Sequence, residues 1–322
     1  MRALVTGAAG FVGSHLCEAL VGEGHDVVGI DAFIPYYARS VKQSNLAGLA
    51  DEERFAFVEA DLRTDDLAPH LDGVEAVVHL AAMPGLARSW TDIELYSSCN
   101  VVGTARLVDA CRLAGVGRFV HISTSSVYGS DAVGDETMPL RPASPYGVTK
   151  LAAEHLVLAN LGQFDFPALI LRYFSIYGPR QRPDMGYHIF SEALLDDLPI
   201  KLFGDGSQTR SNTYIDDCVR GTVLAVEHGQ FGEIYNIGGG DVVSVLEAIE
   251  LLSAAAGTRP RLVHTDPRPG DQRATAAICD KAAEHFGYRA RVSPAEGLAR
   301  QFAWHRDRRA RSEPASRGCM AP

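Results

Sequence analysis

Short apolar segments alternate with longer helix-like stretches through the first half of the chain, and this alternation constrains the fold most strongly. The apolar segments are nearly continuous, which is typical of parallel strands that are covered on both faces. We expect such strands at residues 2–6, 26–31, 55–60, 75–81, 118–123 and 166–174, and helices at 11–21, 93–114 and 146–160. The pattern predicts an α/β fold built on a doubly wound, Rossmann-type parallel sheet.

The rhythm changes after residue 174. Gly, Pro, Asp and Arg cluster in 178–184, 204–212 and 267–272, as they do in loops that close over a ligand. We therefore expect a first domain at 1–174 and a smaller C-terminal substrate-binding lobe at 175–305, some elements of which can return to the first domain. The polar segment 306–322 predicts a disordered tail.

Composition narrows the classes of partner. The formal net charge of −10 argues against nucleic-acid binding, which needs a basic surface, but not against a small anionic ligand in a basic pocket. No apolar run approaches the ~20 residues of a membrane span. The six cysteines form no C-x-x-C pair, no histidine cluster has zinc spacing, and no export signal is visible. We expect a cytoplasmic protein without a metal site.

A glycine-rich turn joins the first predicted strand to the first helix. Glycines at 7, 10 and 13 let the backbone turn tightly and approach a pyrophosphate at the helix N-terminus. Asp31 ends the second strand 18 residues after Gly13, where a carboxylate binds the adenosine ribose and repels a 2′-phosphate. We therefore expect NAD; the alternative is a structural turn with a capping aspartate. The cofactor-binding residues predicted from these positions and from the ends of the next two strands are Gly7, Gly10, Phe11, Val12, Gly13, Asp31, Asp61, Leu62, Ala81 and Ala82.

Tyr146 and Lys150 lie one turn apart at the start of a predicted helix, and Thr124 follows the fifth strand. A phenol with a pKa of ~10 is a poor base at neutral pH, but a nearby ammonium group favours the phenolate. Such a pair on a solvated helix face is the alternative interpretation. The hydroxyl groups of residues 124–126 at the carboxyl edge of the sheet, where ligands bind in such folds, favour a catalytic site.

These motifs resemble the extended short-chain dehydrogenase/reductases over residues 1–305: the G-x-x-G-x-x-G turn, the Thr and Tyr-x-x-x-Lys set, and the VYG sequence at 127–129. The resemblance implies that Tyr146 removes a proton from a sugar hydroxyl, that Lys150 also binds the nicotinamide ribose, and that Thr124 steadies the substrate. It adds Asn100, Tyr146, Lys150 and Tyr173 to the cofactor-binding residues. It also implies a homodimer formed by the helices at 93–114 and 146–160.

The two residues after Thr124 indicate the reaction. The 4,6-dehydratases of this family carry Asp-Glu there and the UDP-glucuronate decarboxylases carry Ser-Glu, whereas this chain has Ser125 and Ser126. Without that carboxylate, the resemblance implies epimerisation at C4 of a UDP-sugar. Residues 172–185 resemble the UDP-glucuronate 4-epimerases, in which a small hydroxyl residue such as Ser175 replaces asparagine. The predicted substrate-binding residues are Ser125, Ser126, Ser175, Arg88, Arg182, Lys201, Phe203, Arg210 and Arg268.

Two segments depart from the family pattern: residues 210–214 differ from the usual T-R-D-F-T-Y run, and the arginine at 88 lies one place later than expected. Three other functions therefore stay open at this stage. The first is a 4-epimerase for UDP-glucose and UDP-galactose, and the second is a UDP-glucuronate decarboxylase. The third is a non-catalytic NAD-sensing module, which the fold alone does not exclude.

Overall fold

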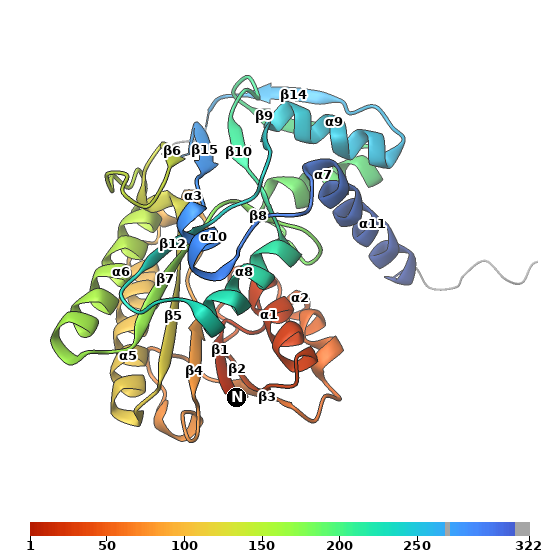
Figure 1. Ribbon diagram of the computed structural model, residues 1–322. Coiled ribbons are helices and arrows are strands. Elements are labelled where there is room, and N and C mark those ends of the chain that lie inside the picture. Colours follow the sequence, from red (N-terminus) through yellow and green to blue (C-terminus); the bar gives the residue numbers. More distant parts are fainter. Residues whose placement is uncertain (268–270, 313–322) are drawn as a thin grey trace, which may run out of the picture.

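A parallel sheet of seven strands forms the centre of the computed structural model, which describes residues 1–267 and 271–312 (Figure 1). The strand order is β12-β7-β5-β4-β1-β2-β3, and every neighbouring pair is parallel. The strands are β1 (Arg2–Thr6), β2 (Asp26–Asp31), β3 (Phe55–Glu59), β4 (Ala76–His79), β5 (Arg118–Thr124), β7 (Ala168–Tyr173) and β12 (Ile234–Ile237). The predicted doubly wound fold is confirmed.

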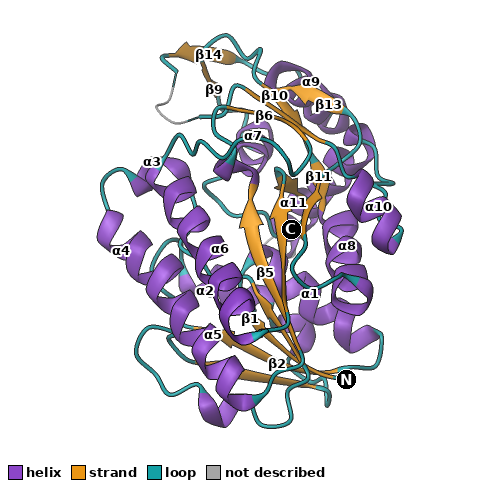
Figure 2. Ribbon diagram, turned by 60° about the vertical axis from the view of Figure 1, so that its left-hand side comes forward, coloured by secondary structure: helices purple, strands orange, loops and turns teal. Residues whose placement is uncertain are grey.

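Helices cover both faces of this sheet (Figure 2). On one face α1 (Phe11–Gly22) packs against α8 (Ile215–His228), and on the other α5 (Gly103–Ala114) packs against α6 (Pro145–Phe164). Alternate residues of β1 point to opposite faces, so Val5 joins the core that includes α1, and Leu4 joins the core that includes α5. The shorter helices of this region are α2 (Arg39–Asn45), α3 (Leu86–Ser89), α4 (Ile93–Ser97), and the 3₁₀ turns Ala47–Leu49, Ala68–His70 and Ser125–Val127.

The helix expected at 93–114 is not uniform. Between α4 and α5 the chain forms a π-helical turn at Ser98–Val102. Such turns are rare in helices and are often found at functional sites. Here the turn contains Asn100, whose side chain is fully buried.

A second lobe lies above the carboxyl edge of the sheet (Figure 1). Its largest sheet has the order β13-β10-β15-β6, and two pairs of strands, β11–β8 and β14–β9, accompany it. Its strands are β6 (Asp131–Gly134), β8 (Ile176–Tyr177), β9 (Ile200–Phe203), β10 (Thr209–Ser211), β11 (Thr213–Tyr214), β13 (Val242–Ser244), β14 (Leu262–Thr265) and β15 (Ala274–Ala277). Its helices are α7 (Gly186–Leu195), α9 (Val245–Ala256) and α11 (Pro294–Ser312), whereas α10 (Asp280–Phe286) packs against α8 and β12. The chain crosses between the lobes more than once, because β6 precedes residue 174 while α8 and β12 return to the central sheet.

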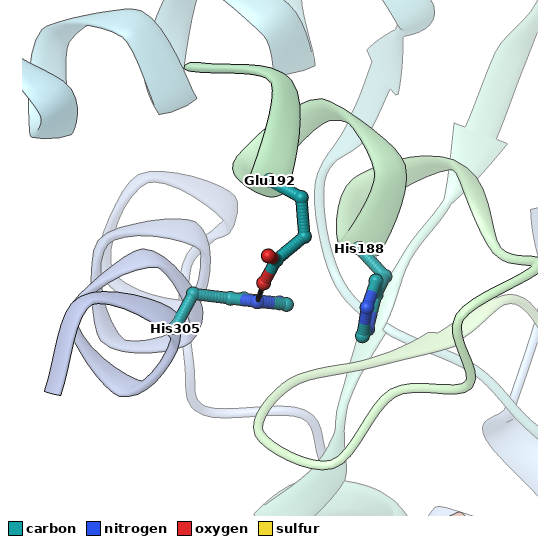
Figure 3. Close-up of side chains that lie close together, drawn as sticks. All are labelled: His188, Glu192 and His305. Atoms are coloured by element: carbon teal, nitrogen blue, oxygen red, sulfur yellow. Dashed lines mark hydrogen bonds and ion pairs between the residues drawn. The ribbon is translucent and has the colours of Figure 1, made fainter. Parts of the chain in front are cut away.

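The expectation of disorder from residue 306 is wrong for 306–312, since α11 continues to Ser312. Residues 313–322 lie outside the described part of the chain. The polar end of α11 is held against α7 by Glu192, which accepts a hydrogen bond from His305 Nδ1 (Figure 3). Glu192 also forms an ion pair with Arg308, whose Nη2 lies 2.8 Å from the carboxylate. Arg309 pairs with Asp196 in the same way.

The contact between α11 and α7 also brings together His188, Glu192 and His305, whose polar atoms lie within 4.8 Å of one another. His188 Nδ1 lies 2.8 Å from the carbonyl oxygen of Gln181, and the two histidine rings meet edge to face with centroids 4.5 Å apart. In this arrangement the edge of one ring faces the π surface of the other. The cluster therefore packs as a polar contact between two helices. Within 1–267 and 271–312, no helix is long and apolar enough to cross a membrane.

Candidate functional site

A cavity of about 450 Å³ lies at the carboxyl edge of the central sheet, between the two lobes. The order of strands reverses at β1 and β4, and in open α/β sheets ligands bind at such a point. Most of the predicted site residues line this cavity: Gly7, Phe11, Val12, Gly13, Asp31, Asp61, Leu62, Ala81, Ala82, Thr124, Ser125, Ser126, Tyr146, Lys150, Tyr173, Ser175, Arg182 and Arg210.

The glycine turn brings the start of α1 close to β1. Gly7 has a φ of 73°, and its N–H donates to the carbonyl oxygen of Ile30 at 2.7 Å. A Cβ on Gly13 would lie 2.1 Å from the Gly7 oxygen, so only glycine fits at 13. Gly10 does not line the cavity, but it precedes α1 and gives that helix no side-chain cap. The first N–H groups of α1 therefore stay available for an anionic ligand.

Asp31 lies at the end of β2 and is buried. Its Oδ1 accepts a hydrogen bond from the backbone N–H of Phe33 and another from Lys42 Nζ, each at 2.8 Å. Lys42 also lines the cavity. Asp61, after β3, is held by Arg63, whose Nη2 lies 2.6 Å from Asp61 Oδ2. This end of the cavity thus has two carboxylates, each paired with a cation.

Asn100 lies behind the cavity and does not line it. Its Oδ1 accepts from the Met83 N–H at 2.6 Å, and its Nδ2 donates to the Met83 carbonyl oxygen at 3.1 Å and to Thr149 Oγ1 at 3.0 Å. Asn100 therefore supports the loop after β4, which does line the cavity through Met83.

Tyr146 and Lys150 share one face of α6. This helix begins where it does because Ser144 accepts from the Gly147 N–H at 3.2 Å and Pro145 occupies the first helical position. Lys150 Nζ donates to the carbonyl oxygen of Ile122 at 2.6 Å. Burial lowers the pKa of Lys150 to about 8, partly opposed by the charge of Glu154. The lysine thus stays protonated at neutral pH.

Burial raises the pKa of the Tyr146 phenol, while the charge of Arg182 and a hydrogen bond with Thr124 lower it. We expected Lys150 to be the cation that favours the phenolate. The cation that acts on Tyr146 is Arg182, because the Lys150 ammonium donates to the Ile122 carbonyl oxygen of β5 instead. Thr124 is at the end of β5, as predicted.

A buried ion pair lies one turn beyond Lys150. Arg172 donates to Glu154 through Nε at 3.0 Å and through Nη2 at 2.7 Å, and both side chains are about 1–2% exposed. Ser123 also donates to Glu154, and Arg172 Nη1 donates to the Tyr128 hydroxyl at 2.9 Å. These groups fix α6 against β5 and β7 directly behind the predicted catalytic residues.

Three serines line the part of the cavity next to Tyr146. Ser125 donates to Gln272 Oε1 at 3.2 Å, and the Ser126 N–H donates to Thr124 Oγ1 at 3.2 Å. Ser175 has a φ of 42°, a left-handed conformation that serine rarely adopts. Hydroxyl groups from two segments, the turn after β5 and the loop after β7, therefore meet on one wall of the cavity.

The predicted basic and aromatic substrate residues separate into two sets. Arg182 and Arg210 line the cavity. Arg88 does not: it pairs with Asp92 at 2.9 Å and donates to the Pro35 carbonyl oxygen at 3.1 Å. Lys201 and Phe203, both on β9, also lie outside the cavity lining, and Lys201 is exposed. Arg268 lies outside the described residues.

Comparison with known proteins agrees with this geometry. The model of the NAD dependent epimerase/dehydratase family matches residues 3–238. The chain belongs to the NAD dependent epimerase/dehydratase family. The crystal structure of UDP-glucuronic acid 4-epimerase from Bacillus cereus, in complex with UDP-glucuronic acid and NAD, is similar with a TM-score of 0.93 and 43% identity, over 95% of this chain and 99% of that one.

Two further relatives of this epimerase/dehydratase have similar lengths. The uncharacterized UDP-glucose epimerase YtcB of Bacillus subtilis is 43% identical over 309 residues, which are 94% of this chain and 98% of the relative. The UDP-glucuronate 4-epimerase of Thermodesulfobacterium geofontis is 34% identical over 310 residues, which are 94% of this chain and 96% of the relative. The family resemblance drawn from the motifs is confirmed.

The residues of the cavity fit NAD, the cofactor of this epimerase/dehydratase family. The space above Gly13 admits no side chain, the start of α1 is uncapped, and Asp31 lies where an adenosine ribose is recognised. Apolar residues such as Ile34 and Leu62 also line the cavity, close in sequence to Asp31 and Asp61, and we call this part of the cavity the adenosine end.

Sequence reasoning missed four residues of the site: Tyr36, Lys42, Asp184 and Gln272. Tyr36, Lys42 and Gln272 line the cavity, and Asp184 binds both Arg182 and Tyr36. All four lie in loops or in a short helix with no regular periodicity. The only signal in the sequence was that these residues occur in long polar and aromatic segments.

Proposed function

We propose that this protein is an NAD-dependent UDP-sugar 4-epimerase that interconverts UDP-glucuronate and UDP-galacturonate. The observation that carries the proposal is the distribution of acids in the cavity. Among the described residues, the carboxylates that line it are Asp31 and Asp61, both at the adenosine end and both paired with cations. Next to Thr124 stand the hydroxyls of Ser125 and Ser126, so the described part of the chain places no lining acid there for water elimination.

The chemistry at C4 needs a base, an orienting group and a hydride carrier. Tyr146, as the phenolate, accepts the proton of the C4 hydroxyl, and Thr124 orients that hydroxyl by hydrogen bonding. When bound, NAD supplies reversible hydride transfer at C4. Lys150 keeps positive charge at neutral pH beside the tyrosine and is itself buried, while Tyr146 is half-buried and faces the cavity in which the sugar would lie. Epimerisation further requires that the oxidised sugar turn to present its other face.

The serine wall suits a uronate. A 4-keto uronate is a β-keto acid, which loses CO₂ readily when its carboxylate is desolvated and aligned with the carbonyl π system. Hydrogen-bond donors that hold the carboxylate ionised and out of that alignment suppress the loss. Ser126 and Ser175 offer hydroxyl donors on this wall, Ser125 is linked to Gln272, and Arg182 supplies positive charge. The relative from Bacillus cereus was crystallised with UDP-glucuronic acid, which supports this choice of substrate.

The decisive experiment is proton NMR of the purified protein with UDP-glucuronate and no added cofactor. We expect UDP-galacturonate to appear without UDP-pentose and without a net change in absorbance of the reduced cofactor. UDP-pentose as the main product would instead establish a decarboxylase. Turnover only of UDP-glucose and UDP-galactose would establish the neutral-sugar epimerase that the name of the Bacillus subtilis relative suggests, and no turnover at all would leave a non-catalytic module.

The serine wall has its own test. Ser126→Ala and Ser175→Ala should each raise the fraction of pentose among the products, because the carboxylate loses a donor. Ser191→Ala is a matched control, since Ser191 is a buried serine of α7 that hydrogen-bonds within its helix. If the two variants keep both the rate and the product ratio of the unaltered protein, the wall does not hold the carboxylate.

We also propose a homodimer in the cytoplasm. Large apolar side chains are exposed on the helices expected to form the interface: Ile93 on α4, Val102 before α5, Leu113 on α5, and Val148 and Phe164 on α6. Light scattering at micromolar protein should give twice the 34.7 kDa of one chain. The five described cysteines are free thiols, which fits a reducing compartment.

A further inference from the structure

Arg182 does not enter the cavity as an isolated cation. Its Nε donates to Asp184 Oδ1 at 3.0 Å and its Nη2 donates to Asp184 Oδ2 at 3.1 Å. The Tyr36 hydroxyl donates to the same carboxylate at 3.2 Å. The guanidinium also lies over the Tyr36 ring, 5.8 Å from its centroid. These three side chains form what we name the Arg182 clamp.

The clamp joins the two lobes. Tyr36 belongs to the loop after β2, which lies at the cofactor end of the cavity, while Arg182 and Asp184 belong to the loop between β8 and α7. The position of the guanidinium is therefore fixed from both sides. Asp184 engages two of the five N–H groups of the guanidinium, which leaves three donors for a ligand.

The clamp also contains a negative charge that opposes the positive charge of Arg182. Burial would raise the pKa of Asp184, but Arg182 and the hydrogen bonds from Arg182 and Tyr36 lower it overall, so the carboxyl group is ionised at neutral pH. An ionised Asp184 in contact with Arg182 offsets a large part of its field. A sugar carboxylate and the Tyr146 phenolate both meet a cation that is already partly neutralised.

We propose that Asp184, supported by Tyr36, is a positioning residue that orients Arg182 and limits its charge, and that it thereby sets both the preference for a carboxylate at C6 and the basicity of Tyr146. This inference rests on the proposed function, because it assumes that the sugar occupies the cavity beside Tyr146. It assigns no contact between Asp184 and the substrate.

The charges that face Tyr146 fix the expected sign. Arg182 faces it from the loop after β8, and the ring of Tyr96 on α4 meets it edge to face at 6.3 Å; Lys150 is on its own helix and Thr124 contacts it from β5. Arg182 is the one full charge among them that comes from another element and acts on the phenol. Removing the Asp184 charge therefore strengthens the field of Arg182 and favours the phenolate, while removing Arg182 disfavours it.

The test uses the whole protein with its bound NAD and compares Asp184→Asn, Tyr36→Phe and Arg182→Gln. Asp184→Asn should shift the acid limb of kcat/KM for UDP-glucuronate to lower pH by about 0.5–1 unit, and Arg182→Gln should shift it to higher pH. UDP-glucose is measured as a competitive inhibitor in the same assays. Asp184→Asn should lower the ratio of the KM for UDP-glucuronate to the inhibition constant of UDP-glucose about three- to tenfold. Tyr36→Phe, which retains the ring, should act in the same direction as Asp184→Asn with a smaller effect.

The matched control is Asp92→Asn. Asp92 pairs with Arg88, whose guanidinium lies over the same Tyr36 ring at 5.5 Å, and the side chains of Asp92 and Asp184 are similarly exposed, at 34% and 36%. That pair does not line the cavity, so neither the pH profile nor the preference should change. Retained NAD and circular dichroism show that each variant is folded.

The outcomes separate the two proposals. If the unaltered protein does not epimerise UDP-glucuronate, the proposed function fails. If the unaltered protein does epimerise UDP-glucuronate, the clamp variants decide. This inference is overturned, while the function stands, if Asp184→Asn and Tyr36→Phe have the same acid limb of kcat/KM and the same preference for UDP-glucuronate over UDP-glucose as Asp92→Asn. A lower kcat with an unmoved limb and unchanged preference would mean that the clamp serves only to maintain the fold.

Discussion

Replacing Glu154 with glutamine should damage both the stability of the protein and the ionisation of Lys150. Glu154 accepts two hydrogen bonds from Arg172, and both side chains are almost fully buried. Glutamine has nearly the same shape but no charge, so Arg172 would remain as a buried guanidinium without a counter-ion. Breaking a buried pair from one side costs about 3–5 kcal/mol in free energy of unfolding, because the remaining charge is uncompensated.

This loss can be expressed as a melting temperature. An unfolding entropy of about 2.1 cal/mol/K per residue gives roughly 0.7 kcal/mol/K for a chain of 322 residues, so Tm should fall by about 4–7 °C. Differential scanning calorimetry at fixed NAD concentration measures the change. Removing both charges, with Glu154→Leu and Arg172→Met, should recover most of the lost stability, since a well-packed apolar pair avoids the desolvation cost.

Lys150 provides the second readout. The charge of Glu154 raises the pKa of Lys150, which burial has lowered to about 8. Without that charge the pKa falls further, and the alkaline limb of kcat should move to lower pH in both the single and the double variant. The control is Glu18→Gln, because the pair of Glu18 with Arg180 is partly exposed and should contribute no more than about 1 kcal/mol. A Glu154→Gln protein as stable as Glu18→Gln, with an unmoved alkaline limb, would refute this reasoning.

Three shorter predictions address the cofactor and the lysine. Gly13→Ala should abolish copurification of NAD, because the new Cβ would lie 2.1 Å from a carbonyl oxygen of the turn. The absorbance released on denaturation measures the bound NAD. The control is Gly22→Ala, whose Cβ meets open space and which should retain NAD. Asp31→Ser should raise the affinity for NADP relative to NAD in calorimetric titrations, because Lys42 loses its carboxylate partner and can pair with a 2′-phosphate; equal discrimination in both proteins would contradict this. The rate of the unaltered enzyme should fall as pH rises through about 8, where Lys150 loses its proton, and this fall should be absent from the slow Lys150→Met variant.

The sequence predicted the central sheet well, because continuous apolar segments have few alternatives to buried parallel strands. β1 and β2 begin and end where the pattern placed them. It did not predict the π-helical turn at Ser98–Val102, because an added residue in a helical turn leaves the apolar periodicity on either side intact. The end of α11 was also missed. Its arginines resemble a solvated tail in composition, and only the positions of Glu192 and Asp196 on α7 show that they have partners.

The site divides in the same way. Residues at the ends of strands, such as Thr124 and Asp31, could be predicted, since parallel strands end at one edge of the sheet. Tyr36 and Asp184 could not, because 148 positions separate them and neither belongs to a repeating pattern. Arg88 was expected in the pocket, but its neighbours Asp92 and Pro35 hold it outside.

Different parts of the fold carry the chemistry and the specificity for the sugar. Tyr146, Lys150 and Glu154 follow one face of α6 at intervals of four residues, so one helix carries the base, its neighbouring cation and the carboxylate that sustains that cation. The sugar end is instead formed by loops from both lobes, with Ser175 in a left-handed conformation and Arg182 held by the clamp. A change in the loops can therefore alter the tolerance for a carboxylate without displacing α6, whereas a change on α6 disturbs the chemistry for every sugar. On this reasoning, a variant that gains activity on neutral UDP-sugars should be sought in the loops that hold Tyr36, Ser175 and Arg182, and its pH profile should shift only when the charge facing Tyr146 has changed.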